Sequence, residues 1–169
     1  MADTTKSVRP EGTGPTLLLL HGNPTWSFLF RDVIGALSAD FRCVALDYPG
    51  FGLSTPGPGY RYLPEEHADV VTGFLDALGL EEVILVGQGR ILASRNFFTE
   101  LEAGLTSLAH LPTLIVWGDA DIAFRPQERE RLEATFTDHR TVIVEGAGTY
   151  VESDAPEEFA AAVRDWVTT

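Results

Sequence analysis

Short apolar segments alternate with longer amphipathic segments along most of this chain. Each apolar segment is only four or five residues long, as expected for strands that are buried on both faces of a sheet. They span Thr16–Leu20, Arg42–Leu46, Val83–Val86, Leu114–Trp117 and Thr141–Val144. Helical spacing of apolar residues follows over 26–37, over 70–78 after Pro64, and over 97–108, 125–136 and 159–167. This order predicts an α/β fold with a parallel sheet and helices on both of its faces.

The composition excludes several classes of protein. Twelve Lys and Arg residues against 25 Asp and Glu residues give a net charge of −13, which argues against nucleic-acid binding. A single cysteine, Cys43, excludes a disulfide framework and a multi-cysteine zinc site. No apolar run approaches the roughly 20 residues of a membrane span. Residues 1–7 lack the apolar region of a signal peptide, so a cytoplasmic protein is expected. The length suits a single domain over residues 1–169.

Polar or glycine-rich residues follow each predicted strand. In parallel sheets the functional site lies beyond the carboxyl ends of the strands, so these residues form the candidate site for a small-molecule substrate. The five strand ends are His21-Gly-Asn23, Asp47-Tyr-Pro-Gly50, Gly87-Gln-Gly-Arg90, Gly118-Asp-Ala-Asp121 and Glu145-Gly-Ala-Gly-Thr-Tyr150.

Four of these segments resemble α/β-hydrolases, in particular the haloalkane dehalogenase branch. Residues 17–28 are similar to its oxyanion-loop segment, and residues 42–54 are similar to its next strand and loop. Trp117-Gly-Asp-Ala-Asp121 resembles the strand end that carries the acid of the catalytic triad, which implies that role for Asp121. The segment from Gly146 to Pro156 resembles the one that carries the triad histidine. The resemblance also implies that Asn23 belongs to the oxyanion hole.

Two positions depart from the pattern of that branch. Gly87-Gln88 continues into Gly89-Arg90, where the branch has a nucleophilic Asp on a sharp turn. The nucleophile, its helix and most of the cap region are therefore expected to be deleted. The position of the histidine is occupied by Thr149, with Tyr150 beside it. A carboxylate nucleophile forms an ester that a histidine-activated water must hydrolyse, so we do not expect a working haloalkane dehalogenase.

The resemblance and the deletion together imply a reduced, cap-less fold. It is a three-layer sandwich with five parallel strands in the order 2-1-3-4-5, like that of flavodoxin. The switch point then lies between the strands ending at His21 and Gln88. A crevice there would be lined by Asp47, Gln88, Arg90 and Tyr150.

Several roles remain open for these residues. His21 is a candidate general base or metal ligand, or a structural residue beside the oxyanion loop. Asn23 either completes an oxyanion hole or packs the loop. His21, Asp47 and Asp121, with Asp119 nearby, are candidate ligands for zinc or manganese, although acidic residues at strand ends also cap helices and form turns.

Two functions follow from this sequence. The first is a non-triad hydrolase of small activated esters or phosphotriesters, metal-assisted or not, with His21, Asn23 and Asp121 as catalytic residues. The second is a catalytically inactive remnant that serves as a binding or structural domain. Loss of the cap is also expected to expose an apolar patch and favour a homodimer. The candidate patch residues are Phe51, Tyr60, Tyr62 and Tyr150.

Overall fold

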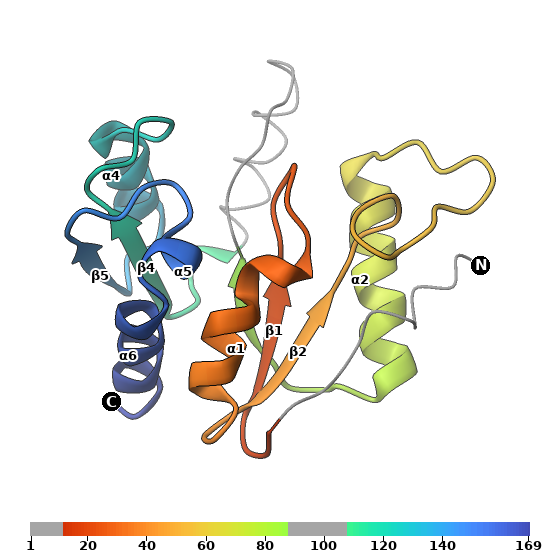
Figure 1. Cartoon of the computed structure of the whole chain (residues 1–169), viewed down its shortest axis with the longest axis horizontal. Helices are drawn as coiled ribbons and strands as arrows, with labels where there is room; N and C mark the ends of the chain where they lie inside the picture. Colours follow the sequence, from red (N-terminus) through yellow and green to blue (C-terminus); the bar gives the residue numbers. More distant parts are fainter. Residues whose placement is uncertain (1–11, 88–107) are drawn as a thin grey trace. The chain divides into compact units, whose positions relative to one another are not determined.

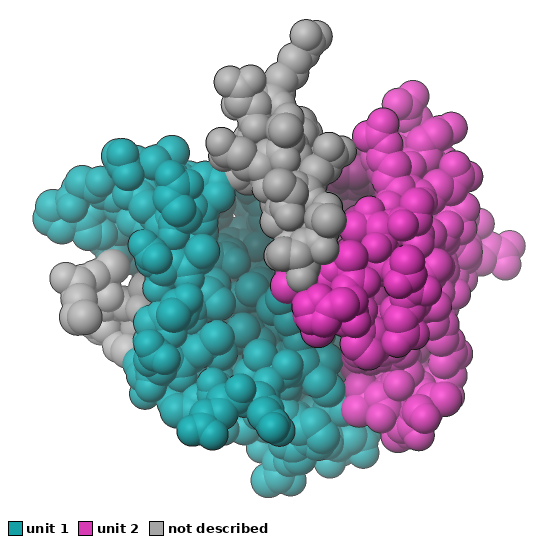
Figure 2. Space-filling view, turned by 180° about the vertical axis from the view of Figure 1, so that it is seen from behind, with its two compact units in different colours: residues 1–91 teal, residues 92–169 magenta. Residues whose placement is uncertain are grey.

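The computed structural model describes residues 12–87 and 108–169 of the 169-residue chain (Figure 1). The chain divides into two compact units, residues 1–91 and residues 92–169 (Figure 2). Each unit is built on a parallel β-sheet of its own, as the alternating sequence pattern predicts.

The sheet of the first unit has three strands in the order β2-β1-β3. They are β1 (Thr16–Leu20), β2 (Arg42–Leu46) and β3 (Ile84–Gly87). In the central register, Leu18 of β1 lies opposite Val44 of β2 on one side and Leu85 of β3 on the other. All pairings are parallel, so the carboxyl ends of the three strands share one edge of this sheet.

Helices accompany both faces of this sheet. Helix α2 (Pro64–Leu78) packs Phe74 and four further residues against Leu18, Val44 and Leu46. A 3-10 turn, η2 (Ser27–Phe30), and α1 (Arg31–Leu37) contribute the buried Phe30, Val33 and Leu37. The helix expected over 26–37 thus begins as a tighter turn. Proline at the first position of α2 and left-handed Gly79 after its last residue set its ends.

Burial differs among the strands of the two sheets. The three central residues of β1 are all buried, as predicted, and so are residues 43–46 of β2. The prediction is wrong for β3 and β5, because Leu85 and Ile143 are 57% and 47% exposed. Apolar side chains alone made these strands look buried on both faces, and each leaves one such side chain open in the structure.

The sheet of the second unit pairs β4 (Thr113–Gly118) with β5 (His139–Val144). On one face, Val116 and Val144 pack with Val151 of α5 (Val151–Asp154) and Phe159 of α6 (Pro156–Val167). Residues alternate between faces along a strand, so Trp117 and its partner Ile143 lie on the other face. Helix α4 (Pro126–Thr135) confirms the helix predicted over 125–136 and has no buried residue.

The observed pairings agree with two parts of the predicted strand order, 2-1-3 and 4-5. The pairing of β3 with β4, and with it the single five-stranded sheet and the single domain, stays a prediction. The helix predicted over 97–108 lies almost entirely outside the described residues. Between 12 and 87 and between 108 and 169, no helix is long and apolar enough to cross a membrane.

Candidate functional site

His21 follows β1 and is buried beneath aromatic side chains. Its Nε2 accepts a hydrogen bond from the backbone N–H of Tyr48 at 3.1 Å, so the ring proton sits on Nδ1 and is donated to the carbonyl of Gly22 at 3.1 Å. The rings of Tyr48 and Phe51 lie 5.0 and 5.3 Å from the imidazole. Burial lowers the pKa of His21, and the neighbouring charge of Asp47 opposes this only in part. Both nitrogens are therefore occupied, which supports the structural role and leaves none free for a base or a metal ligand.

Asp47 follows β2 and binds backbone groups of two separate segments of the chain. Its Oδ1 accepts from the backbone N–H of Ser27 at 2.8 Å, and its Oδ2 accepts from that of Leu53 at 3.0 Å. The side chain is almost completely buried, at 1% exposure. A buried carboxylate is stable when both oxygens are hydrogen-bonded, so Asp47 ties η2 to the loop after β2.

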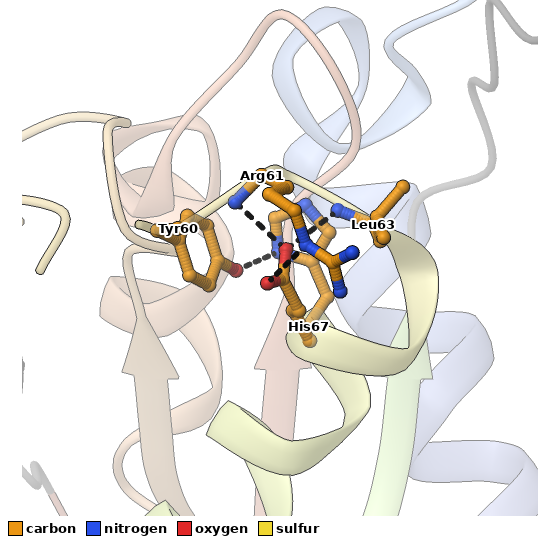
Figure 3. Close-up of polar contacts among 5 residues, drawn as sticks. Tyr60, Arg61, Leu63 and His67 are labelled. Atoms are coloured by element: carbon orange, nitrogen blue, oxygen red, sulfur yellow. Dashed lines mark hydrogen bonds and ion pairs between the residues drawn. The ribbon is translucent and has the colours of Figure 1, made fainter. Parts of the chain in front are cut away.

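A second polar group lies where α2 begins (Figure 3). The hydroxyl of Tyr60 and Nδ1 of His67 are 2.8 Å apart, and burial raises the pKa of Tyr60 to about 12 while it lowers that of His67. The hydrogen bond therefore joins a neutral phenol to a neutral imidazole. Glu66 accepts from the backbone N–H groups of Arg61 and Leu63, which lowers its pKa. These contacts hold the loop before α2 in place, and His67 is half-buried.

The apolar patch expected from loss of the cap is only partly exposed. Phe51 and Tyr60 pack their rings against His67, and Tyr62 alone of the four predicted residues is widely exposed, at 49%. Trp26 and Phe28, whose ring centroids are 5.7 Å apart, are exposed as well. The homodimer stays a prediction.

The carboxyl end of β4 carries the Asp121 carboxylate. Its Oδ1 accepts from the backbone N–H groups of Ala123 and Phe124 at 2.7 and 2.9 Å, and from the hydroxyl of Thr149 at 2.7 Å. Within the described part of the chain, Oδ2 accepts no hydrogen bond. Asp121 and Thr149, which stand at the predicted positions of the acid and the histidine, are thus in direct contact.

Two further carboxylates hold the loop after β5, one at the end of β4 and one on α5. Oδ1 of Asp119 accepts from the N–H of Gly146 at 2.6 Å, and Oδ2 of Asp154 accepts from that of Gly148 at 2.9 Å. The approach is so close that a Cβ on Gly118 would lie 2.2 Å from the carbonyl oxygen of Ala147. Glycine at position 118 therefore permits the close approach of the loop after β5 to the end of β4.

Gly118→Ala is expected to lower the free energy of unfolding by about 3 kcal/mol, because backbone rather than a flexible side chain obstructs the new methyl group. Urea unfolding measures this. Gly73→Ala is the control, since its Cβ would meet nothing within 4 Å on α2 and a small stabilisation of up to ~1 kcal/mol is expected. Equal stability of the two variants would contradict the close packing at Gly118.

A small pocket of about 180 Å³ opens beside Asp121 on the α4 side of β4. Trp117 and Phe124 form its aromatic wall with ring centroids 6.5 Å apart, and Asp119 and Arg129 supply further polar groups. Ligand pockets for drug-sized molecules usually measure roughly 300–1,000 Å³, so this one accepts only a small molecule.

Glu152 on α5 is a buried carboxyl group that the sequence did not single out. It is 4% exposed, and its Oε1 has no hydrogen-bond partner among the described residues. Burial raises the pKa of Glu152 to about 7, with a smaller contribution from the charge of Asp154 and against the opposing hydrogen bond of its own backbone N–H. The group therefore titrates near neutral pH.

The remaining predicted site residues are distributed as follows. Asn23 is exposed, and Tyr150 directly precedes α5. Gln88 and Arg90 lie outside the described residues. No group of three potential metal ligands forms within residues 12–87 and 108–169. To bind zinc or manganese, His21 and Asp47 would have to give up their backbone hydrogen bonds.

One sequence signal could have revealed Glu152. It lies three and seven residues before Ala155 and Phe159, both of which pack on the buried cluster of this unit. That is helical spacing, and it places Glu152 on the apolar stripe of the terminal segment. The helix predicted over 159–167 does not include this position.

Comparison with known proteins agrees with this fold. A family profile described as "alpha/beta hydrolase fold" matches residues 15–90. The haloalkane dehalogenase 2 of Mycobacterium bovis is 32% identical over 251 positions, covering 90% of this chain and 88% of the relative. A haloalkane dehalogenase of Mesorhizobium japonicum is 36% identical over 141 positions, covering 80% of this chain and 44% of that protein.

Two solved structures show the same fold. A putative ancestral haloalkane dehalogenase superposes with a TM-score of 0.82 at 19% identity, covering 96% of this chain and 94% of that one. A thermophilic esterase from Thermogutta terrifontis superposes with a TM-score of 0.81 at 18% identity, covering 99% and 97%. The chain belongs to the α/β-hydrolase family. Within that family it falls in the haloalkane dehalogenase-like branch, which confirms the resemblance seen in the sequence.

Proposed function

We propose that this α/β-hydrolase has lost the water-activating histidine of its branch and hydrolyses only small activated esters or phosphotriesters, slowly, at the carboxyl end of β4. The observation that carries the proposal is the hydrogen bond from Thr149 Oγ1 to Asp121 Oδ1. A threonine hydroxyl does not take a proton from water near neutral pH, whereas an imidazole does. The Asp121 carboxylate is therefore the base that is left at this site.

The geometry sets what such a site can do. Oδ2 of Asp121 is not engaged by the described residues, so it can hold the attacking water beside the small pocket. A carboxylate is a weak base at neutral pH, and general bases of better-matched pKa contribute typically 10²–10⁴-fold. Substrates must therefore be activated, with a leaving group that departs without protonation. Asn23 and His21, on the first unit, have no step in this mechanism.

Loss of the nucleophile segment is part of the same proposal. Its support is the length of the alignment with the Mycobacterium bovis protein, whose 251 positions exceed the 169 residues of this chain. Long stretches of that relative thus have no counterpart here. The break in the pattern after Gln88 is where the sequence places the missing segment.

A second candidate is a binding or structural domain without turnover. It is favoured by the hydrogen bonds of His21 and Asp47. Both ring nitrogens of His21 and both carboxylate oxygens of Asp47 are bonded to backbone groups. The polar residues at those strand ends then serve the architecture of the loops rather than chemistry.

Hydrolysis of 4-nitrophenyl acetate and diethyl 4-nitrophenyl phosphate separates these candidates. We expect slow wild-type turnover of at least one substrate that falls to background in Asp121→Asn, because the amide keeps the acceptor atom and removes the base. Glu158→Gln, at an exposed position of α6 outside the pocket, is the control, and its rate should equal that of the wild type.

Further arms of the assay decide the mechanism. Loss of turnover in EDTA with recovery in zinc or manganese would replace the carboxylate mechanism by a metal-assisted one. Background rates from folded wild-type protein would overturn hydrolysis and support the binding or structural domain.

A further inference from the structure

Glu152 is buried with fewer hydrogen-bond partners than a carboxylate requires. Its side chain is 4% exposed and its Oε1 accepts no hydrogen bond from the described residues. An ionised carboxylate in such a place loses more hydration than one hydrogen bond from its own backbone N–H compensates, whereas the neutral acid loses far less. The packed position of α5 is therefore compatible with the neutral form of Glu152 and opposed by the ionised form.

The element that carries Glu152 is a single helical turn. Helix α5 spans only Val151–Asp154 and is closed by three backbone hydrogen bonds, from Ser153 and Asp154 to Tyr150 and from Ala155 to Val151. A turn this short has little stability of its own, and its packing on β4 and α6 keeps it in place. It can open without unfolding the rest of its unit.

The charges around α5 do not stabilise the ionised form of Glu152. Asp154, on the same turn, repels it. Among the other charged side chains on α6 and at the carboxyl end of β4, only Arg164 is basic. The rest are acidic: Glu157, Glu158, Asp165, Asp119 and Asp121. Among the described residues, the charge that acts most on Glu152 is thus of its own sign.

Opening of α5 affects the contact between Asp121 and Thr149, because Thr149 is joined directly to this turn. Thr149 immediately precedes Tyr150, at which the turn begins, and Asp154 at its end holds Gly148. We propose that Glu152 is a pH-sensitive latch, which in its neutral form keeps α5 docked and in its ionised form releases the turn and separates Thr149 from Asp121. This inference concerns the conformation of the loop and does not depend on the proposed hydrolysis.

Amide hydrogen exchange of the full chain by NMR tests the latch. After correction for the intrinsic pH dependence of exchange, we expect the protection of Ser153, Asp154 and Ala155 to fall about tenfold or more between pH 6 and pH 8.5. Glu152→Gln, which cannot ionise, should keep its protection constant. Glu157→Gln, on the exposed side of α6, is the control and should behave as the wild type.

Two results would overturn the latch. One is constant protection of the three amides in the wild type over this pH range. The other is the same fall in Glu152→Gln as in the wild type. Should Glu152→Gln fail to fold, the carboxyl carbon resonance of Glu152 in the wild type decides: a titration midpoint near neutral pH supports the latch, and one near the ordinary 4.5 contradicts it.

Discussion

Glu152→Met is expected to raise the free energy of unfolding by about 2–3 kcal/mol at pH 8 and by much less at pH 4. The pKa of Glu152 rises from 4.5 to about 7 on folding, so the folded chain holds this proton more tightly than the unfolded chain. Stability is then unaffected below pH 4.5, falls as the pH rises from 4.5 to 7, and stays reduced above 7. One pKa unit corresponds to about 1.4 kcal/mol of unfolding free energy. Opening of α5 limits the total loss of this free energy, because it exposes the ionised carboxylate to water.

Methionine suits this test because it fills a similar volume and carries no polar atom that needs a strong partner. Urea unfolding of wild type and variant at pH 4, 6 and 8 gives the difference directly. Glu158→Met, at an exposed position of α6, is the control, and we expect a change within about 0.5 kcal/mol that does not vary with pH. A Glu152→Met effect of the same size at pH 4 and pH 8 would contradict the burial of an ionisable acid.

The regular elements of the fold could largely be predicted from local patterns. Apolar runs located all five strands to within three residues, since a strand buried in a parallel sheet needs continuous apolar side chains. Proline marked the starts of α2, α4 and α6, where its missing N–H costs nothing. The single turn α5 was missed because four residues carry too little periodicity to show a helix.

The candidate site was harder to predict, because its chemistry depends on hydrogen bonds between distant loops. The sequence identified His21, Asp47 and Asp121 as polar residues at strand ends. It does not show that Tyr48 and Gly22 occupy both nitrogens of His21, since that depends on the path of the chain after β2. The contact of Thr149 with Asp121 likewise spans 28 positions and forms only when β4 and β5 pair.

Thr149→His is expected to give the largest change in activity, an increase of about 100-fold or more in 4-nitrophenyl acetate hydrolysis at pH 8. Thr149 already contacts the Asp121 carboxylate, so an imidazole at this position can use the same oxygen to orient its ring. A carboxylate also favours the imidazolium that forms as the base accepts a proton from water. Thr149→Ala removes the hydroxyl without adding a base and should stay at or below the wild-type rate.

The most direct test of a hydrolase skeleton that lacks its base compares Thr149→His with and without Asp121→Asn on this ester. We predict that the single variant gains about 100-fold and that the double variant loses most of this gain, because the asparagine no longer supports the imidazolium. A Thr149→His variant that is folded and no faster than the wild type, or a gain that Asp121→Asn leaves intact, would contradict the assignment of Asp121 and Thr149 as the remaining acid and the vacated base position.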